Sequence, residues 1–377
     1  MIGAEAGDDQ MRVSMLVDKP LPSDRPTGMG IAAFNMALAL SKRGTKVHFM
    51  CRGNTNVSSI LNDNLRVHRL RHYTRDNFSA SLKLVSREQI DIFHLHSSST
   101  LPSLLVAKAF GVKTLVHSHG VERLRLGRAS MSRGIGMRAC DMVAAVSEST
   151  KAGIIRTYHI SPKKIEVVHN GVNLQDLQPA RDFDAASRYG LEGVDRIILS
   201  IGSVHEAKGQ RMIIECLPAI LKAWPKVAYV NAGPTYDSSY ERQLLARAET
   251  LRVTKSVRLL GSIPHQELMG LIKSADICVH PSLREGFPLA VLEEMALGKP
   301  VVASNIAAIG EVIDDRVDGV LVAATDTEAV ADSILELLAN PDLASKLGGA
   351  AMAKVSAKFT WDQTASRLEE IYRDLLR

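Results

Sequence analysis

Two glutamates in the second half of the chain, Glu285 and Glu293, stand eight positions apart and could share one ligand. Glu285 falls in a loop, whereas Glu293 falls one turn into a helix that Pro288 is expected to start. The backbone N–H groups of Phe287–Ala290 would then be unpaired at a helix N-terminus, a natural seat for a pyrophosphate. The two carboxylates could reach hydroxyl groups on either side of that anion, as in a nucleotide sugar. The alternative is an acidic amphipathic helix after a turn, and Glu294 fits that alternative.

The segments around this pair have the pattern of an alternating α/β domain. Apolar runs alternate with segments of helical periodicity, which predicts a parallel sheet wound by helices on both faces. The strands expected here are Arg196–Ile201, Val227–Ala232, Val257–Gly261, Ile277–His280, Pro300–Ala303 and Val320–Val322. The main expected helices are Gly209–Trp224, Tyr240–Leu251 and Thr327–Ala339.

The first half of the chain repeats this pattern. Its expected elements are strands at Arg12–Val17, Lys46–Met50, Asp91–Leu95, Lys113–His117 and Asp141–Val146, and a helix at Ile31–Lys42 that ends at Gly44. A polar stretch near residues 177–192 reads as the linker, so we expect domains at 1–177 and 178–360. The predicted fold class is therefore α/β, with two Rossmann-like doubly wound domains facing a cleft. Ligands of such sheets bind at the carboxyl ends of the strands.

Composition narrows the class of protein. With 46% hydrophobic and 23% charged residues in 377, the chain has ordinary soluble-globular composition, which excludes a disordered protein. The four cysteines are far apart and lie in or beside apolar runs, so buried free thiols are expected. Residues 1–10 are acidic and polar, unlike a secretory signal, and no apolar run is long enough to span a bilayer. We therefore expect a cytoplasmic protein, with the cytosolic membrane face as a peripheral location.

Charge is unevenly distributed between the two halves. Residues 1–177 carry ten more basic than acidic side chains, while the remainder carries five more acidic than basic. A basic half can attract phosphate, an anionic membrane or nucleic acid, although a solvated surface is an equally good explanation. Five arginines fall within sixteen residues: Arg123, Arg125, Arg128, Arg133 and Arg138. An anionic acceptor or membrane surface is the hypothesis that this cluster motivates; nucleic acid is not expected.

The combination of these motifs resembles glycosyltransferase family 4, whose members are retaining enzymes with the GT-B fold. The segments that carry the resemblance are Glu285-Gly-Phe-Pro with Glu293 and Met295–Val302, Ser274-Ala-Asp, Pro281-Ser282, Val168–Asn173, Ala145–Glu148, Thr27–Gly30 and Phe359-Thr-Trp. The segments before Lys299 together cover most of Met11–Lys299, and Phe359-Thr-Trp with the helix after it fits the family as well. In this family the last helix, here 361–377, typically crosses back onto the first domain, which binds the acceptor. The second domain binds the nucleotide sugar.

The resemblance also assigns roles in the second domain. Glu285 would bind donor-sugar hydroxyls, and Glu293 would bind the ribose hydroxyls. Lys208 would hold the diphosphate, whose negative charge grows as it leaves. The remaining donor-binding residues implied are Ser203, Ile263 at the base, Gly286, Phe287, Pro288, and Leu289 beside the nucleotide.

In the first domain, the resemblance places His119 facing the donor sugar, where it would support oxocarbenium-like charge. His117 is interpreted as structural. Gly28 and Gly30 would let the backbone approach the diphosphate and acceptor closely. The catalytic residues implied are thus His119, Lys208 and Glu285.

One position departs from the family pattern. Members usually carry Arg directly after Gly202, and this chain has Ser203. The loss of one diphosphate cation motivates an alternative function, a nucleotide-sugar-binding protein with weak or no transfer activity. Arg211 or the helix terminus at Phe287 could compensate.

Two other motifs suggest different chemistry. Gly28-Met-Gly30-Ile-Ala-Ala spells a dinucleotide fingerprint, but about ten residues separate it from its strand, and Arg52 stands where NAD would need an acidic residue. Asp182-Phe-Asp184 spells a D-x-D metal motif, but it lies in the linker, and Asp184 suits a helix N-cap. We therefore expect no cofactor and no metal.

The prediction is a hexosyltransferase-type enzyme that moves sugar from a UDP-, GDP- or ADP-sugar to a hydroxyl acceptor with retained configuration. Such an enzyme would act in the biosynthesis of glycans, glycolipids or glycosylated metabolites. A sugar-nucleotide epimerase of the same architecture is a further alternative.

Overall fold

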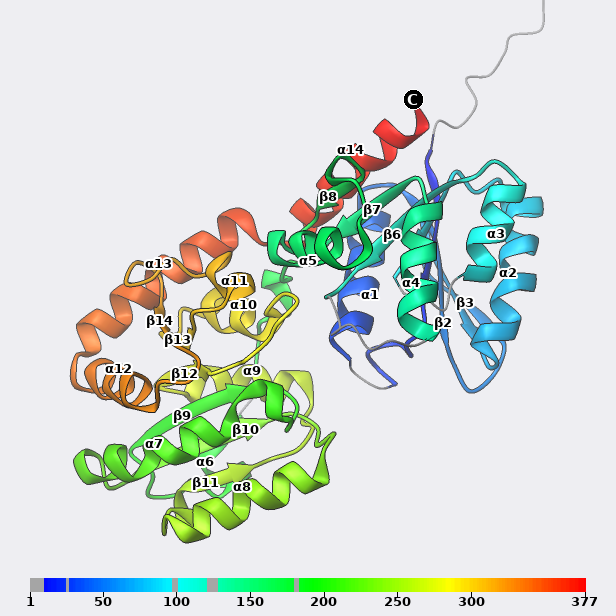
Figure 1. The fold of residues 1–377 in the computed structure, drawn as a ribbon. Coiled ribbons are helices and arrows are strands. Elements are labelled where there is room, and N and C mark those ends of the chain that lie inside the picture. Colours follow the sequence, from blue (N-terminus) through cyan, green and yellow to red (C-terminus); the bar gives the residue numbers. More distant parts are fainter. Residues whose placement is uncertain (1–9, 25–26, 97–100, 121–127, 180–182) are drawn as a thin grey trace, which may run out of the picture. The chain divides into compact units, whose positions relative to one another are not determined.

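The chain divides into two compact units in the computed structural model, which describes residues 10–24, 27–96, 101–120, 128–179 and 183–377 (Figure 1). The first unit is Met1–Gly171 with Trp361–Arg377, and the second is Val172–Thr360. The division falls after Gly171, a few residues before the boundary expected at 177. The last helix, red in Figure 1, groups with the first unit although it is distant in sequence.

The first unit is built on an eight-stranded sheet in the order β3-β4-β2-β1-β5-β6-β7-β8. Neighbouring strands are parallel except β3 and β4, which form an antiparallel hairpin. The strands are β1 (Arg12–Val17), β2 (Lys46–Arg52), β3 (Val57–Asn62), β4 (Leu65–Leu70), β5 (Ile92–Leu95), β6 (Lys113–Ser118), β7 (Met142–Ala145) and β8 (Ile165–Val167). The helices are α1 (Gly28–Lys42), α2 (Tyr73–Glu88), α3 (Leu101–Ala109), α4 (Arg128–Ala139), α5 (Glu148–Tyr158) and α14 (Trp361–Leu376), with the short η2 (Pro162–Lys164).

The central strands of this sheet are buried on both faces, as parallel strands covered by helices must be. Helix α14 covers part of one face because it is strongly amphipathic and buries Trp361, Leu368 and Tyr372. It packs against α1, where Arg43 at the end of α1 pairs with Asp362 at 3.0 Å.

The second unit is built on a six-stranded parallel sheet in the order β11-β10-β9-β12-β13-β14. Its strands are β9 (Arg196–Ile201), β10 (Val227–Ala232), β11 (Val257–Leu259), β12 (Ile277–His280), β13 (Val301–Ser304) and β14 (Val320–Val322). Its helices are α6 (Ala185–Tyr189), α7 (Gln210–Ala223), α8 (Ser238–Thr250), α9 (His265–Ser274), α10 (Leu289–Ala296), α11 (Ala307–Gly310), α12 (Thr327–Ala339) and α13 (Pro341–Lys358). Single 3-10 turns are η3 (Leu174–Asp176), η4 (Glu206–Lys208) and η5 (Thr254–Ser256).

Each sheet reverses its strand order once. In the first unit the chain adds strands on one side of β1 and then returns to add β5 on the other. In the second unit it runs from β9 to β10 and β11, then returns to place β12 against the free side of β9. In open α/β sheets, ligands bind at the carboxyl ends of the strands beside such a reversal, in what is called the crevice. In the second unit this rule places the ligand crevice at the carboxyl ends of β9 and β12.

The predicted α/β class with two Rossmann-like domains is confirmed. Five strands have the predicted bounds: β1, β9, β10, β12 and β14. The β3–β4 hairpin was not predicted, because β3 is exposed over most of its length and shows no buried alternation. None of the helices in the described part of the chain has the length and apolar composition that crossing a membrane requires.

Candidate functional site

The loops after β9 and β12 meet at the crevice of the second unit through an ion pair. Lys208 ends η4 in the loop after β9, and its Nζ lies 2.5 Å from Oε1 of Glu285, in the loop after β12. The two side chains are 30% and 13% exposed, so the pair is largely shielded yet reachable from solvent. Ser282 Oγ donates to the same carboxylate oxygen at 2.8 Å. The structure thus joins two predicted site residues that lie 77 positions apart in sequence.

Glycines make this close approach of the loops feasible. Gly209 follows Lys208 with φ of +70°, and a Cβ there would lie 2.0 Å from the carbonyl oxygen of Pro281. Gly233, at the end of β10, has φ of +154°, and a Cβ there would lie 2.2 Å from the carbonyl oxygen of Gly202. Side chains at either position would push the loops apart. The stem of Lys208 passes over Gly202, which holds its ammonium group at the crevice.

Ser203 lies in this loop without adding a cation. Its carbonyl oxygen accepts a hydrogen bond from Gln210 Nε2 at 2.8 Å, at the start of α7. Arg211, which could have replaced the missing family arginine, instead pairs with Glu215 one turn along α7, with 3.3 Å between Nε and Oε1. Among the described side chains of this loop, Lys208 is the cation held at the crevice.

The N-terminus of α10 offers fewer free donors than the sequence suggested. The helix begins at Leu289, with Pro288 as its N-cap residue. The Leu289 N–H donates to the carbonyl oxygen of Phe287 at 3.1 Å, and Pro288 has no N–H. The expectation of a row of unpaired N–H groups at Phe287–Ala290 is therefore wrong at Leu289, because the turn before the helix closes on itself. Phe287 is buried and lies against Phe359, with 6.0 Å between ring centroids.

Glu293 and Glu294 are adjacent on α10 but have different environments. Glu293 is half-buried, and its carboxylate has no hydrogen-bond partner within the described residues. Burial, with a smaller effect from the charge of Glu294, raises the pKa of Glu293 to about 8. A half-buried carboxyl group whose oxygens have no protein partner is suited to bind ligand hydroxyls.

Glu294 is fully buried, which corrects its assignment to a solvated helix face. Its Oε2 lies 2.6 Å from Nε2 of His280, the last residue of β12, and the Cys278 thiol also interacts with this carboxyl group. Burial raises the pKa of Glu294, although His280 opposes that shift. The His280–Glu294 pair was not predicted from the sequence. The only available signal was a histidine at a strand end followed fourteen residues later by a glutamate, which is not specific.

The remaining predicted residues of the second unit lie in its loops. Gly286 precedes the buried Phe287, and Ile263 is half-buried in the loop after β11. The backbone beside Ile263 is held near the crevice, since Gly233 N–H donates to the carbonyl oxygen of Gly261 at 2.8 Å.

In the first unit, His119 follows β6 and belongs to a group of four histidines. Its Nε2 lies 2.9 Å from Nδ1 of His96, which follows β5. Burial lowers the pKa of His119 to about 4, so its imidazole is neutral at neutral pH. His94 and His117 lie behind this pair, fully buried. The three residues His94, His96 and His117 are the described group that could hold a metal ion.

The two predicted glycines of the first unit differ in their surroundings. A Cβ on Gly30 would lie 2.9 Å from Oγ1 of Thr27 and 3.2 Å from the carbonyl oxygen of Pro20. Gly30 is therefore required by the N-cap of α1, where Thr27 Oγ1 accepts from its N–H. Gly28 has open space around its Cα, and the helix N-terminus beside it is exposed.

The motifs set aside in the sequence have structural roles. Asp184 caps α6, where its carboxylate accepts from Ala186 N–H at 3.0 Å, as predicted. Arg52 pairs with Asp18 at 2.7 Å. The prediction of four buried free cysteines is also confirmed. Asp182 lies outside the described residues.

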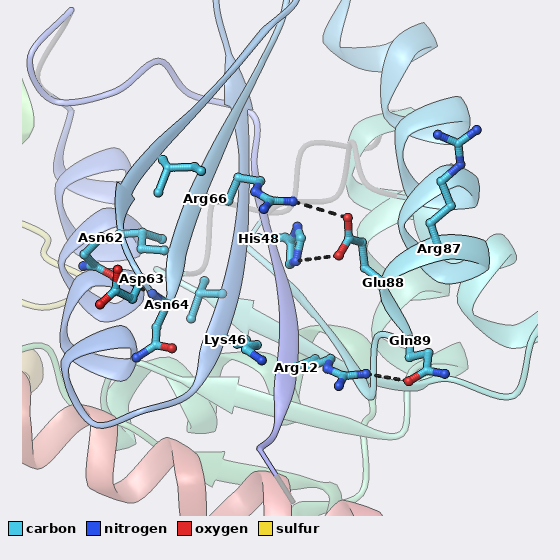
Figure 2. A pocket seen from close by; sticks show the side chains of 13 residues that line it. Arg12, Lys46, His48, Asn62, Asp63, Asn64, Arg66, Arg87, Glu88 and Gln89 are labelled. Atoms are coloured by element: carbon cyan, nitrogen blue, oxygen red, sulfur yellow. Dashed lines mark hydrogen bonds and ion pairs between the residues drawn. The ribbon is translucent and has the colours of Figure 1, made fainter. Parts of the chain in front are cut away.

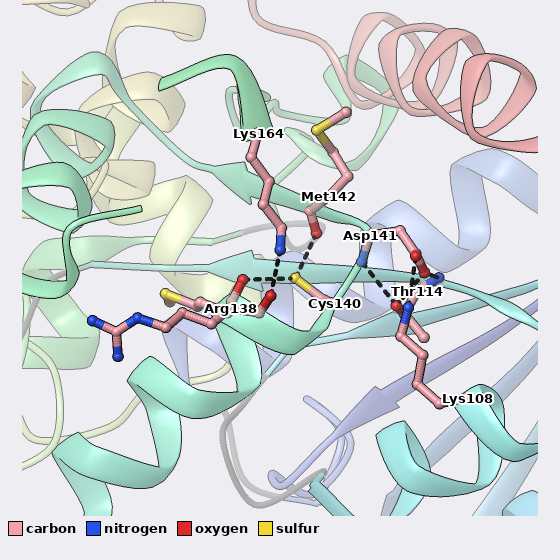
Figure 3. A network of polar contacts seen from close by, with 8 residues as sticks. Lys108, Thr114, Arg138, Cys140, Asp141, Met142 and Lys164 are labelled. Atoms are coloured by element: carbon pink, nitrogen blue, oxygen red, sulfur yellow. Dashed lines mark hydrogen bonds and ion pairs between the residues drawn. The ribbon is translucent and has the colours of Figure 1, made fainter. Parts of the chain in front are cut away.

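Only part of the arginine cluster falls within the residues that the structure describes. Arg123 and Arg125 lie outside the described residues, and Arg128 begins α4. Arg138 donates to the carbonyl oxygen of Tyr158 at 2.8 Å, which links α4 to the end of α5. Figure 3 shows the neighbouring contacts, in which Lys164 Nζ donates to the carbonyl oxygen of Arg138 at 2.6 Å. Arg138 therefore has a structural function.

A polar pocket of about 540 Å³ lies in the first unit where strands of the sheet begin, at the end of the sheet opposite to their carboxyl ends (Figure 2). Arg12, Lys46 and Arg66 begin or nearly begin their strands there. Its charges are partly neutralised, since Arg66 pairs with Glu88 at 3.3 Å. Its position at the amino ends of the strands separates it from the crevice expected for this fold.

Two family models match the chain in succession. The model described as Glycosyltransferase Family 4 matches residues 26–176, and the model described as Glycosyl transferases group 1 matches residues 184–354. Each match falls largely within one of the two units.

Curated relatives match over different lengths. A D-inositol 3-phosphate glycosyltransferase of Thermobispora bispora is 32% identical over 243 residues, which are 63% of this chain and 56% of the relative. The chain thus spans about half the length of such relatives. An N-acetyl-alpha-D-glucosaminyl L-malate synthase of Bacillus anthracis is 25% identical over 372 residues, covering 93% of this chain and 94% of the relative.

Solved structures resemble the whole chain in fold. A sucrose-phosphate synthase from Thermosynechococcus elongatus has a TM-score of 0.80 at 21% identity, covering 97% of this chain and 99% of its own. Anabaena Alr3699/HepE in complex with UDP and glucose has a TM-score of 0.80 at 14% identity, covering 97% and 100%. At such low identity these likenesses show the fold alone.

Proposed function

Because the chain belongs to glycosyltransferase family 4 and has the GT-B fold, we propose that it transfers a sugar from a nucleotide-sugar donor to a hydroxyl acceptor with retained configuration. The observation that carries this proposal is the Lys208–Glu285 pair at the crevice of the second sheet. One cation and one carboxylate, held together where a doubly wound sheet binds ligands, match the diphosphate and sugar of such a donor.

The proposal gives each residue of the crevice a chemical role. Lys208 binds the diphosphate and stabilises the charge that develops as it leaves. Glu285 exchanges its bond with Lys208 for the hydroxyls of the donor sugar. Glu293, which has no partner of its own within the described residues, accepts from the ribose hydroxyls. By family analogy, a donor phosphate oxygen acts as the base, and neutral His119 supports the sugar from the first unit.

The donor class is supported by the ligands in solved structures that share this fold. Structures of Anabaena Alr3699/HepE hold UDP or UDP-glucose, and starch synthase IV from Arabidopsis thaliana holds ADP. We therefore propose a UDP-, GDP- or ADP-sugar as donor. With Lys208 as the diphosphate cation, this transfer requires no metal at the donor.

For the acceptor, we propose a hydroxyl compound that carries negative charge. The names of two curated relatives point to such compounds, D-inositol 3-phosphate and L-malate. The basic first half of the chain suits such an anion. An anionic membrane surface is the other acceptor environment, and each basic residue near it would add about 1 kcal/mol. If the protein binds anionic but not neutral liposomes, and salt weakens that binding, the acceptor lies at an anionic membrane surface.

The test is the release of nucleoside diphosphate from a panel of donors with and without acceptors that include inositol phosphate and malate. Transfer predicts release that depends on acceptor, and proton NMR of the product then reports whether the anomeric configuration is retained. Lys208→Met should abolish release, whereas Lys222→Met, an exposed lysine on α7, should leave it unchanged. Release that is independent of acceptor and of Lys208 would contradict the proposal.

Ser203 and the ion-paired Arg211 favour one alternative, a protein that binds nucleotide sugars without transferring them. Donor binding by calorimetry, with no product from any acceptor, would support it. Conversion of the donor sugar into its epimer without acceptor would instead indicate an epimerase.

A further inference from the structure

Four histidines at the carboxyl ends of β5 and β6 share one face of the first sheet. They occur as His94-Leu-His96 and His117-Ser-His119, and the register pairs Leu95 with Val116. Because side chains alternate along a strand, residues two apart point to the same face. The rings stack in succession, with centroids 4.2 Å apart for His94 and His96 and 4.8 Å apart for His117 and His119.

The hydrogen bonds of this cluster leave two buried nitrogens without a partner. Nδ1 of His94 lies 2.6 Å from the Tyr372 hydroxyl on α14, and its Nε2 lies 3.1 Å from Nδ1 of His117. Nδ1 of His96 lies 2.9 Å from Nε2 of His119. Nε2 of His96 and Nε2 of His117 are buried and have no partner within the described residues. Buried polar atoms normally have one, so these two call for an additional group.

The spacing of the nitrogens fits a metal ion. One ring nitrogen from each of His94, His96 and His117 lies within 4.8 Å of the others. Two ligands of a tetrahedral zinc ion, each at roughly 2.0–2.1 Å from the metal, are roughly 3.4 Å apart. Coordination would bring these nitrogens from within 4.8 Å of one another to about that spacing, and the hydrogen bond between Nε2 of His94 and Nδ1 of His117 would be replaced by bonds to the metal.

We propose that His94, His96 and His117 bind one late first-row divalent ion of the zinc class. Imidazole nitrogens suit Zn²⁺, Co²⁺, Ni²⁺ and Cu²⁺, and three of them leave a fourth position for water. Ligating histidines usually have their other ring nitrogen hydrogen-bonded. Here the Tyr372 hydroxyl is hydrogen-bonded to Nδ1 of His94, and Nε2 of His119 is hydrogen-bonded to Nδ1 of His96. His119 is half-buried, whereas the three proposed ligands are buried.

This site belongs to the first unit, whereas Lys208 and Glu285 belong to the second, and it goes beyond the proposed transfer function. The experiment therefore measures metal alone, without any donor. Metal-free full-length protein is titrated with Co²⁺ and with Zn²⁺, and bound metal is measured after gel filtration. We expect one ion per chain, with the visible absorption of Co²⁺ in a site of low coordination number.

Variants separate this site from surface binding. His96→Gln and His117→Gln should weaken the affinity about hundredfold, and Tyr372→Phe by roughly tenfold, since outer contacts tune metal affinity. His72→Gln is the matched control, because His72 is an exposed histidine of the same unit. Circular dichroism identifies variants that fold.

The unmodified protein makes the test decisive even if a variant does not fold. Uptake of less than a stoichiometric amount by that protein would overturn the proposal and leave water as the partner of the two nitrogens. Stoichiometric uptake that persists unchanged in folded His96→Gln would place the metal elsewhere and also overturn it.

Discussion

The ion pair between Lys208 and Glu285 should oppose the binding of a free nucleoside diphosphate. The diphosphate can pair with Lys208 only if the lysine first breaks its ion pair with Glu285. The free energy that this costs makes the binding of the diphosphate less favourable. Glu285→Gln removes the competing charge while keeping the shape of the side chain. This variant should therefore bind UDP, GDP or ADP more tightly than the unmodified protein.

The size of this effect follows from the exposure of the pair. Fully exposed pairs contribute about 0.2–1 kcal/mol, and shielded charge-assisted hydrogen bonds about 1.5–3 kcal/mol. With side chains 30% and 13% exposed and 2.5 Å between Nζ and Oε1, the Lys208–Glu285 pair lies between these classes. About 1–2 kcal/mol is expected, which corresponds to a roughly five- to thirtyfold gain in affinity.

Isothermal titration calorimetry with each nucleoside diphosphate measures this gain. Glu336→Gln is the matched control, since it removes the carboxylate of the Arg316–Glu336 pair in the same unit. Sugar transfer by Glu285→Gln should fall despite the tighter diphosphate binding, because the sugar loses its carboxylate. If folded Glu285→Gln binds the diphosphate as well as the unmodified protein or more weakly, then Glu285 and the diphosphate do not compete for Lys208.

Three further predictions concern the same unit. Ser203→Arg should tighten diphosphate binding about tenfold in calorimetry, because it adds one charge-assisted contact. Ser239→Arg on α8 is the control and should not change the affinity. Equal effects of the two substitutions would show that added positive charge acts without a specific contact. Glu293 has a folded-state pKa of about 8, above its ordinary 4.5, so its contribution to stability is present below about pH 4.5 and is lost as pH rises to 8. Glu293→Gln should therefore raise the melting temperature at pH 8 but hardly at pH 4, while weakening nucleotide binding at least tenfold; a pH-independent shift would contradict the raised pKa. His280→Phe leaves the buried Glu294 carboxyl group without its histidine partner and should lower the free energy of unfolding by about 3 kcal/mol. Urea titrations measure this loss, and a loss below about 1 kcal/mol would show that the pair is dispensable for stability.

The fold could be predicted well from the sequence because its signals are local. Runs such as Val227–Ala232 are buried along their whole length, so a largely apolar stretch between polar turns marks a central parallel strand, even though this one includes the polar Asn231. The edge strand β3 carries no such signal, since most of its residues face solvent. Caps were equally local, as the Asp184 side chain bonds to a residue two positions away.

The candidate site was only partly accessible in this way. Family resemblance selected Glu285, Glu293 and Lys208, but it could not indicate that Lys208 and Glu285 contact each other. Their contact depends on strand order, because β9 and β12 become neighbours only when the sheet reverses direction. The separate environments of Glu293 and Glu294 also depend on what packs against each side of α10.

What the sequence alone determined, then, is the alternation of strands and helices, the two-domain division and the identity of the motif residues. These follow from patterns within a few residues of one another. The tertiary structure decided which of those residues meet: Lys208 with Glu285, Glu294 with His280, and the two H-x-H segments in one stacked cluster with Tyr372. Such contacts join residues as far as 278 positions apart. The order and register of the strands fix them, and no local pattern in the chain encodes either.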